Sequence, residues 1–144
     1  GKDGVPPDAI RGEMAISGSG NHLYVAGNKM LSLFERALET GHLLHLQTVD
    51  YQPVQSTAAW HSASSLSIDS FGLRILATSG YGVTIYSRDQ ASGELEFGSH
   101  VTAWEPTWGF GVSTTMSPNG HLMFATNWDW DWLEVLEVCD PNTN

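Results

Sequence analysis

The stretch that decides the fold is Ile16 to Val49, which reads ISGSGNHLYVAGNKMLSLFERALETGHLLHLQTV. A second copy runs from Ile68 to Val101 as IDSFGLRILATSGYGVTIYSRDQASGELEFGSHV, and the two copies align without a gap at an offset of 52 positions (68 − 16 and 101 − 49). A third copy opens at Met116 as MSPNGHLMFATN. A period near 50 with several short strands in each unit is typical of a radial array of β-sheets.

Each of the first two copies contains four expected strands separated by turn residues. In the first copy we place these strands at residues 12–17, 22–26, 31–34 and 43–49. Gly20 and Gly41 stand in the turns, where a short hairpin needs a positive φ that glycine adopts at little cost. The strands are apolar on both faces, so each sheet must pack between two neighbours, and radial stacking around an axis provides them.

The fold class predicted is therefore all-β, with propeller blades of four antiparallel strands in an incomplete ring. We assign residues 1–10 to an entry segment or linker, 11–49 to blade 1, 50–101 to blade 2 with its connector, and 102–144 to a partial blade 3. The sequence ends where the outer strand of blade 3 is expected to begin. The pattern thus predicts about three blades, with the last one lacking its outer strand.

Several runs resemble the lactonase-like, YVTN-type β-propeller repeats. The residues that carry the resemblance are the run SGNHLYVAG at 19–27, Phe34-Glu35-Arg36 and Thr40-Gly41-His42-Leu43, and the opening Ser117-Pro118-Asn119-Gly120 in the third copy. The second copy departs from the family's opening with Asp69-Ser70-Phe71-Gly72. The resemblance implies a propeller, usually of seven blades. Members of that family include sugar-lactone hydrolases and secreted or surface proteins without known chemistry. It implies no catalytic residue here.

Composition excludes some functions. The net charge is −10 with only six Lys plus Arg, which argues against nucleic-acid binding and against anionic membranes, because both need clustered positive charge. No apolar run approaches the roughly 20 residues of a membrane helix. Cys139 is the single cysteine, so an internal disulfide is excluded. From the family resemblance we expect an extracellular or cell-surface location.

An open row of blades leaves an apolar sheet face bare at each end and a bare strand edge in blade 3, which favours pairing with another chain. We therefore expect the row to be completed by further blades of the same polypeptide, by a partner chain, or by copies of itself.

Tryptophans mark the connectors between blades. Trp60 lies 12 positions before Gly72, and Trp108 lies 12 positions before Gly120. The favoured interpretation is that each ring wedges between adjacent sheets at the rim of the central channel. The alternative is a ligand-binding role, with the ring facing the channel.

The run Asn127-Trp128-Asp129-Trp130-Asp131-Trp132 falls in the hairpin between the second and third strands of blade 3. A calcium loop is one interpretation, because three oxygen ligands alternate. However, the glycine and the distal glutamate of an EF-type loop are missing. A solvated acidic hairpin is favoured. A glycan-binding surface is the third interpretation, since tryptophan faces stack on sugar rings, and an interface with a protein fits the same residues.

No catalytic residue, metal site or cofactor is predicted. The histidines are dispersed, one cysteine cannot build a zinc cluster, and no nucleophile elbow or phosphate-binding glycine loop occurs. Gly80 and Gly82 are interpreted as a strand-to-strand turn. His100, Trp104 and Glu105 precede the inner strand of blade 3, and a position facing the central channel is a weak hypothesis for them.

The function favoured by the sequence is a non-enzymatic propeller segment that serves as an interaction or assembly scaffold in a secreted or cell-surface protein. Two alternatives stay open. One is a lactonase-like hydrolase whose active site is shared with blades that these residues do not include. The other is a glycan-binding module.

Overall fold

A computed structural model of the chain describes residues 12–27, 30–50, 63–79, 82–102, 113–127 and 132–138. These residues form eleven β-strands and no helix, so none of them belongs to a helix that could cross a membrane. The strands are β1 (Met14–Ile16), β2 (His22–Ala26), β3 (Met30–Arg36), β4 (Leu43–Asp50), β5 (Ser65–Ile68), β6 (Arg74–Ser79), β7 (Gly82–Arg88), β8 (Leu95–Thr102), β9 (Ser113–Met116), β10 (Leu122–Asn127) and β11 (Trp132–Glu137).

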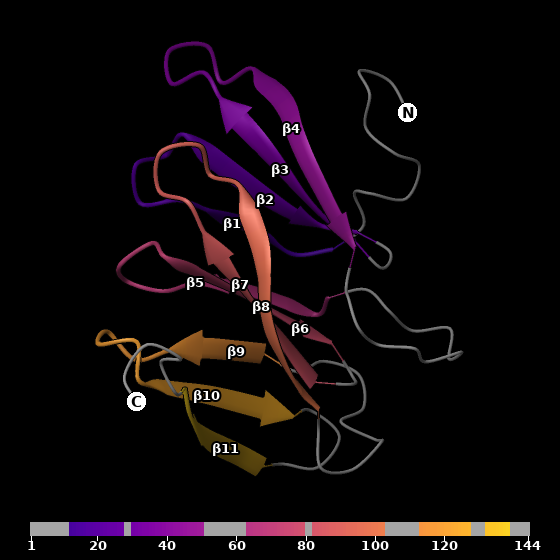
Figure 1. Cartoon of the computed structure of the whole chain (residues 1–144), viewed down its shortest axis with the longest axis vertical. Coiled ribbons are helices and arrows are strands. Elements are labelled where there is room, and N and C mark those ends of the chain that lie inside the picture. Colours follow the sequence, from indigo (N-terminus) through magenta and orange to yellow (C-terminus); the bar gives the residue numbers. More distant parts are fainter. Residues whose placement is uncertain are drawn as a thin grey trace.

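The strands form three antiparallel sheets, which we call blades 1, 2 and 3. Blade 1 has the order β1-β2-β3-β4, blade 2 has β5-β6-β7-β8, and blade 3 has β9-β10-β11. Figure 1 shows the three blades stacked one on another. The all-β class, the four-stranded blades and the incomplete ring expected from the repeat are confirmed.

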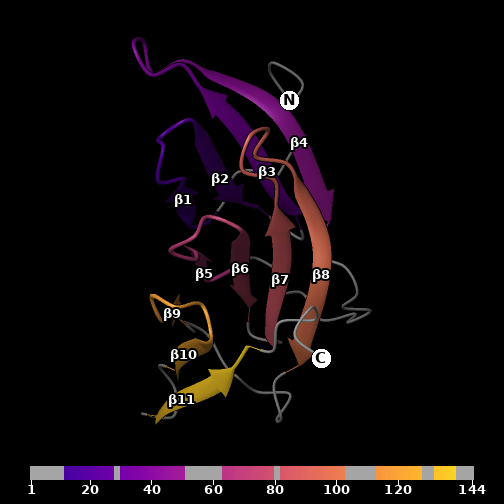
Figure 2. The same cartoon turned by 60° about the vertical axis from the view of Figure 1, so that its left-hand side comes forward.

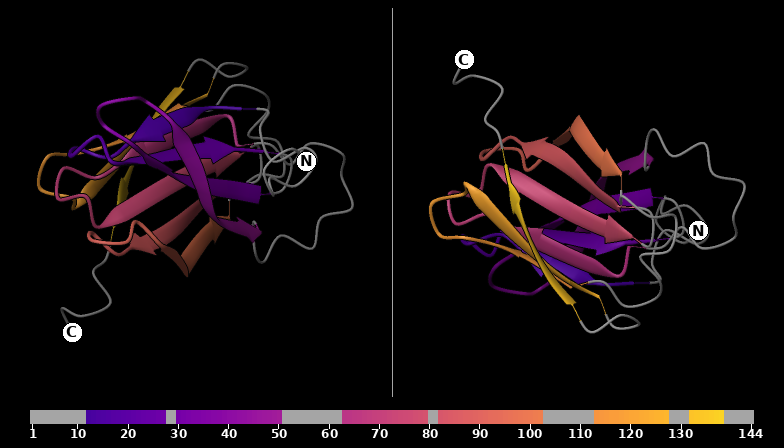
Figure 3. Two further views of the ribbon diagram at one scale, coloured as in Figure 1. Left: turned by 90° about the horizontal axis from the view of Figure 1, so that it is seen from above. Right: turned by 90° about the horizontal axis from the view of Figure 1, so that it is seen from below.

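The first strands of the three blades lie next to one another. β5 contacts both β1 and β9, and Figure 2 shows these three strands in one column with β4 and β8 on the far side. Seen from above and below, the blades are rotated relative to each other, as in a propeller (Figure 3). The column of β1, β5 and β9 therefore lies nearest the propeller axis.

The turn after each axial strand is built in the same way three times. Ser17 Oγ accepts the backbone N–H of His22 at 3.1 Å, and Asp69 Oδ1 accepts that of Arg74 at 3.1 Å. Ser117 repeats the arrangement with Leu122 at 2.9 Å. The glycine three residues into each turn has a φ near 70°, which explains the glycine at that point of every copy (Gly20, Gly72 and Gly120).

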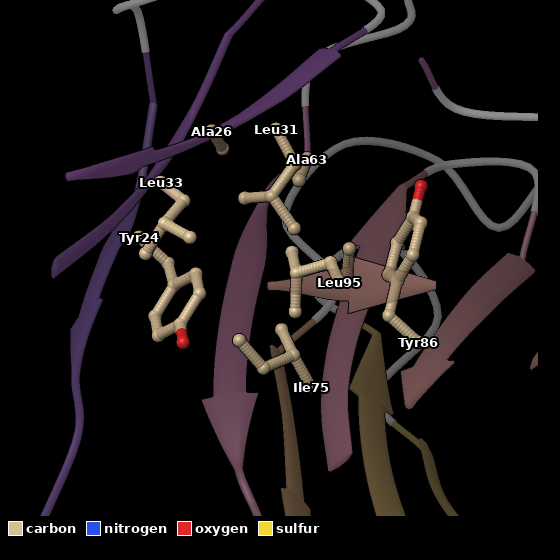
Figure 4. Packing of buried hydrophobic residues seen from close by; sticks show 9 residues of the cluster. Tyr24, Ala26, Leu31, Leu33, Ala63, Ile75, Tyr86 and Leu95 are labelled. Carbon is tan, nitrogen blue, oxygen red and sulfur yellow. The ribbon is translucent and has the colours of Figure 1, made fainter. Parts of the chain in front are cut away.

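Alternation along β6 explains how blade 2 packs on both sides. Ile75 and Ala77 join a core with Tyr24, Leu33 and neighbouring residues of blade 1 (Figure 4). The intervening Leu76 joins a second core with Met123, Ala125, Val83 and Val138, between blades 2 and 3. Successive strand residues point to opposite faces, so one apolar strand supplies both cores.

Several details differ from the sequence prediction. β1 (Met14–Ile16) is shorter than residues 12–17, and β4 (Leu43–Asp50) extends one residue beyond 43–49. The third strand of blade 1 is longer than residues 31–34, because its pairing with β2 continues to Glu35 and its pairing with β4 continues to Arg36. Gly82 is the first residue of β7 and pairs with Ser79, whereas we expected it within the turn. Its φ of 136° lies in a region that other residues rarely adopt, which explains why a glycine begins the strand.

Candidate functional site

The structure describes few of the residues that the sequence analysis selected. Trp60, Glu105, Trp108, Trp128, Asp129, Trp130 and Asp131 lie outside the described residues, as does Cys139. Trp132 begins β11, where its backbone pairs with Asn127. A ligand-binding role for these residues therefore stays a prediction.

His100 occupies a different place from the one expected. It lies on β8, the outermost strand of blade 2, and its Nδ1 is 3.0 Å from Thr84 Oγ1 on β7. The strands nearest the axis are β1, β5 and β9, so His100 does not face the central channel. The sequence placed it near the next axial strand, but β8 and β9 are separated by residues 103–112.

Hydroxyl groups join blades 2 and 3 where β5 and β9 begin. Thr78 Oγ1 and Thr114 Oγ1 are 2.6 Å apart, and the backbone N–H of Thr114 donates to Ser65 Oγ at 3.3 Å. Ser67, further along β5, has the one buried side-chain oxygen among the described residues that lacks a hydrogen-bond partner. Polar groups from Thr78, Thr114 and Ser65 therefore lie at this end of the axial column.

Arg88 joins blades 1 and 2 through buried hydrogen bonds. Its Nε donates to Tyr24 Oη at 2.5 Å, its Nη1 to the Gly72 carbonyl at 2.7 Å, and its Nη2 contacts His22 Nδ1 at 2.9 Å. Tyr24 Oη in turn donates to the Gly93 carbonyl at 2.7 Å. We call Arg88, Tyr24 and His22 the Arg88 cluster. It connects β7 and its turn to β2 of the neighbouring blade.

The electrostatics of the Arg88 cluster hold His22 neutral. A guanidinium has only donors, so His22 Nδ1 must accept, and the ring proton sits on Nε2. Burial, and secondarily the positive charge of Arg88, lower the pKa of His22 below 6.5, against the opposing effects of Glu35 and Asp89. Burial also raises the pKa of Tyr24, although its hydrogen bond with Arg88 acts in the other direction. Both neutral forms are therefore favoured in the folded chain.

We expect stability to fall on acidification through His22. Because the folded pKa of His22 lies below the unfolded one, the unfolded chain takes up the proton first, and stability is lost as the pH falls below 6.5. Urea-unfolding midpoints at about pH 7.5 and about pH 5.5 measure this loss. A His22→Asn variant keeps an acceptor near the Nδ1 position and should show a smaller difference. An equal difference in both proteins would contradict the prediction.

The sequence did not predict the Arg88 cluster, although it contains one signal for it. Arg36 and Arg88 occupy the same place in the repeat, and such a repeated charge beside an apolar strand indicates a shared structural role. Arg36 Nη1 lies 3.4 Å from the Gly20 carbonyl, which parallels the bond of Arg88 to Gly72. Only Arg88 has His22 and Tyr24 of an adjacent blade beside it.

A groove with a volume of about 500 Å³ lies between the outer half of blade 2 and the edge of β11. We call it the β8–β11 groove. Its lining is mostly apolar and comprises Arg74, Ile85, Ser87, Gly98, Ser99, Val101, Met123, Leu136, Glu137 and Val138. In the part of the chain that the structure describes, no three His, Cys, Asp or Glu side chains are grouped to hold a metal ion.

Comparison with known proteins gives likenesses of structure. No family model matches the sequence, and no curated protein matches it. The structure is similar to the periplasmic gluconolactonase of Pseudomonas aeruginosa, with a TM-score of 0.78 and 22% identity over 95% of this chain and 38% of that one.

Two further similar structures are putative 6-phosphogluconolactonases. The one from Bacteroides fragilis has a TM-score of 0.74 and 19% identity over 92% of this chain and 36% of that chain. The one from Bacteroides uniformis has a TM-score of 0.71 and 18% identity over 92% and 38%. This chain spans 36–38% of the length of these proteins. Its three blades have the fold of the lactonase-like β-propellers.

Proposed function

We propose that these residues contribute three blades to a propeller that hydrolyses sugar lactones, with an active site shared with blades outside the 144 residues. The observation that carries the proposal is the backbone likeness to a gluconolactonase, with a TM-score of 0.78 over 95% of the chain. The two putative 6-phosphogluconolactonases support the same function. The likeness favours the hydrolase over the non-enzymatic scaffold, which the sequence alone favoured.

The end of the axial column where β5 and β9 begin is the proposed location of the site. Trp60 precedes β5 in the sequence, and Glu105 and Trp108 precede β9. In lactone hydrolysis water adds to the carbonyl carbon, the ring C–O bond breaks, and the ring oxygen takes a proton to give a hydroxy acid. A carboxylate such as Glu105 suits the general base that removes a proton from the water. A tryptophan face suits the sugar ring.

Charge favours an uncharged sugar lactone as substrate. The chain has a net charge of −10 and only six Lys plus Arg. The three arginines within the described residues, Arg36, Arg74 and Arg88, each direct a guanidinium nitrogen to a backbone carbonyl. The negative charge of the protein would repel the phosphate of a phosphorylated lactone, because the field of an acidic protein lowers the local concentration of anions. We therefore propose gluconolactone rather than its 6-phosphate.

Acid release from glucono-δ-lactone, followed with a pH indicator, tests this proposal. We expect the purified full-length polypeptide, which includes the blades outside these 144 residues, to exceed the spontaneous rate and to prefer gluconolactone over 6-phosphogluconolactone. A Glu105→Gln variant should lower turnover by about a hundredfold, as loss of a general base does. His100→Asn is the matched control, because His100 lies on an outer strand, and it should leave turnover unchanged. Hydrolysis no faster than in buffer, for either lactone, would refute the proposal.

The exposed end faces support a propeller completed by further blades. Leu133 and Val135 on β11 are 62% and 53% exposed, and Met14 on β1 is 63% exposed. Both faces of blade 2 are covered by neighbouring blades, so the middle sheet shows what such faces contact in this fold. An extracytoplasmic location is part of the proposal, because the gluconolactonase to which the chain is similar is periplasmic.

A further inference from the structure

β4 and β8 occupy equivalent places as the outermost strands of blades 1 and 2. Among the described strands, β4 pairs with β3 alone and β8 with β7 alone, and Figure 2 shows both along one flank of the molecule. Both pairs have a register shift at the same point of the repeat, between Leu33 and Phe34 in blade 1 and between Ile85 and Tyr86 in blade 2. The two open edges therefore have the same backbone arrangement, and they differ in their side chains.

Side chains protect the edge of β8 and leave the edge of β4 unprotected. Glu96 is exposed on β8, and a charge on an edge strand opposes pairing with another chain. Leu44 is the residue of β4 at the same place, 52 positions earlier (96 − 44), and it is 61% exposed. Two positions later β4 has Leu46, 43% exposed, where β8 has Gly98. From residue 43 to residue 49, β4 has none of the charged residues or prolines by which edge strands avoid association.

The exposure of Leu44 does not arise from an uncovered end face. Leu44 pairs with Glu35, and the alternate residues Leu31 and Leu33 of β3 belong to the core between blades 1 and 2. Paired residues share a face of the sheet, as do alternate residues of one strand, so Leu44 lies on the face that packs against blade 2. Its side chain is more than half exposed with blade 2 in place. Further blades would cover the opposite face of blade 1, so Leu44 remains a surface residue.

The hydrogen-bonding register identifies which backbone groups of β4 are available. The N–H of Ala37 donates to the His42 carbonyl at 2.9 Å, so His42 bonds towards β3. Antiparallel residues alternate between those bonded to one neighbour and those directed to the other side. Leu44 therefore also bonds towards β3, whereas Leu43 and His45 direct their N–H and C=O groups to the open edge. A further strand can pair with these groups without breaking a hydrogen bond to β3.

We propose that β4 pairs with β4 of a second copy of this chain, antiparallel and about a two-fold axis, to form a dimer. A second copy fits because residues 43–49 contain no Asp, Glu, Lys or Arg, so two β4 strands place no like charges opposite each other, although each chain has a net charge of −10. Leu44 and Leu46 of each copy are then covered by the other copy, and this apolar burial stabilises the pair. A two-fold pair occupies the edge of both copies, so association ends at the dimer. This inference does not depend on the proposed hydrolase activity.

Sedimentation velocity of the full-length polypeptide, from about 1 μM to about 100 μM, tests the pairing. We expect a monomer–dimer equilibrium that added salt strengthens, because salt screens the repulsion between two acidic copies. Leu44→Glu gives β4 the residue that β8 has at this place and should weaken dimerisation by about tenfold or more. Leu73→Glu is the matched control. Leu73 is 49% exposed just before β6 of blade 2, so this variant adds the same charge away from β4 and should dimerise as the parent does.

Hydrogen exchange of the parent protein gives a second readout that does not depend on folding of a variant. The N–H groups of Leu43 and His45 should exchange more slowly at the higher concentration, because the second copy provides their acceptors. A protein that is monomeric at every concentration, or equal exchange at both concentrations, would overturn the proposal. A dimer that Leu44→Glu leaves intact, or that Leu73→Glu weakens as much, would place the contact elsewhere and overturn the assignment to β4.

Discussion

Replacing Arg88 with alanine is expected to lower the free energy of unfolding by about 3 kcal/mol, because charged hydrogen bonds are lost and their buried acceptors lose a donor. Arg88 is only 6% exposed and donates to Tyr24 and to the Gly72 carbonyl, while it also contacts His22 Nδ1. The remaining carbonyl and imidazole would stay buried between two apolar blades. Urea unfolding followed by tryptophan fluorescence and circular dichroism measures the loss.

The repeat supplies the control for this experiment. Arg36 is the equivalent residue of blade 1, is half-buried, and among the described residues its side chain makes one weak hydrogen bond, of 3.4 Å to the Gly20 carbonyl. Arg36→Ala should therefore cost less than about 1 kcal/mol. If both variants lose the same stability, the contribution of Arg88 comes from its own turn alone, and its role between the blades would be refuted.

The second large effect is expected at Gly93, where alanine should cost about 3 kcal/mol through backbone strain and overpacking. The φ of Gly93 is 78°, in the left-handed region that suits glycine. A Cβ built there would lie 2.6 Å from Cδ2 of His22 and 2.7 Å from its Cγ. The imidazole is held by Arg88, so it has little freedom to move away. Thermal and urea unfolding measure the loss.

Gly41 is the matched control because it separates strain from contact. It lies 52 positions earlier, has a φ of 72°, and nothing stands within 4 Å of a Cβ built on it. Gly41→Ala should therefore cost only the left-handed strain, about 1 kcal/mol. In a His22→Ala background the cost of Gly93→Ala should approach that of Gly41→Ala. If Gly93→Ala costs the same with and without the ring of His22, the steric explanation is wrong.

Local signals explain what the sequence predicted well. Glycines at the same place in successive copies predicted the positive φ of Gly20 and Gly41, because that conformation depends on the turn residue itself. The boundaries of β2 were predicted residue by residue, since turn residues flank a short β-rich run on both sides. The offset of 52 then transferred both predictions from blade 1 to blade 2.

Contacts between blades could not be predicted in the same way. Arg88 and His22 are 66 positions apart, and nothing in either local run shows that the two side chains meet. The repeat even hides the contact, because Arg36 has the same local sequence context without such neighbours. Most of the candidate ligand-binding residues lie in the connectors or in the hairpin between β10 and β11, and a pattern of strands and turns predicts the strands alone.

Val138 occupies the position in blade 3 that Arg88 occupies in blade 2. The contact between blades 1 and 2 therefore contains a buried charged group at this position, and the contact between blades 2 and 3 does not. Val138 packs with Leu76 and Met123, so the joint between blades 2 and 3 is held there by apolar contact. Apolar contact weakens in the cold, whereas the joint between blades 1 and 2 carries a buried guanidinium and an imidazole. Acidification should therefore weaken the contact between blades 1 and 2 more than the contact between blades 2 and 3.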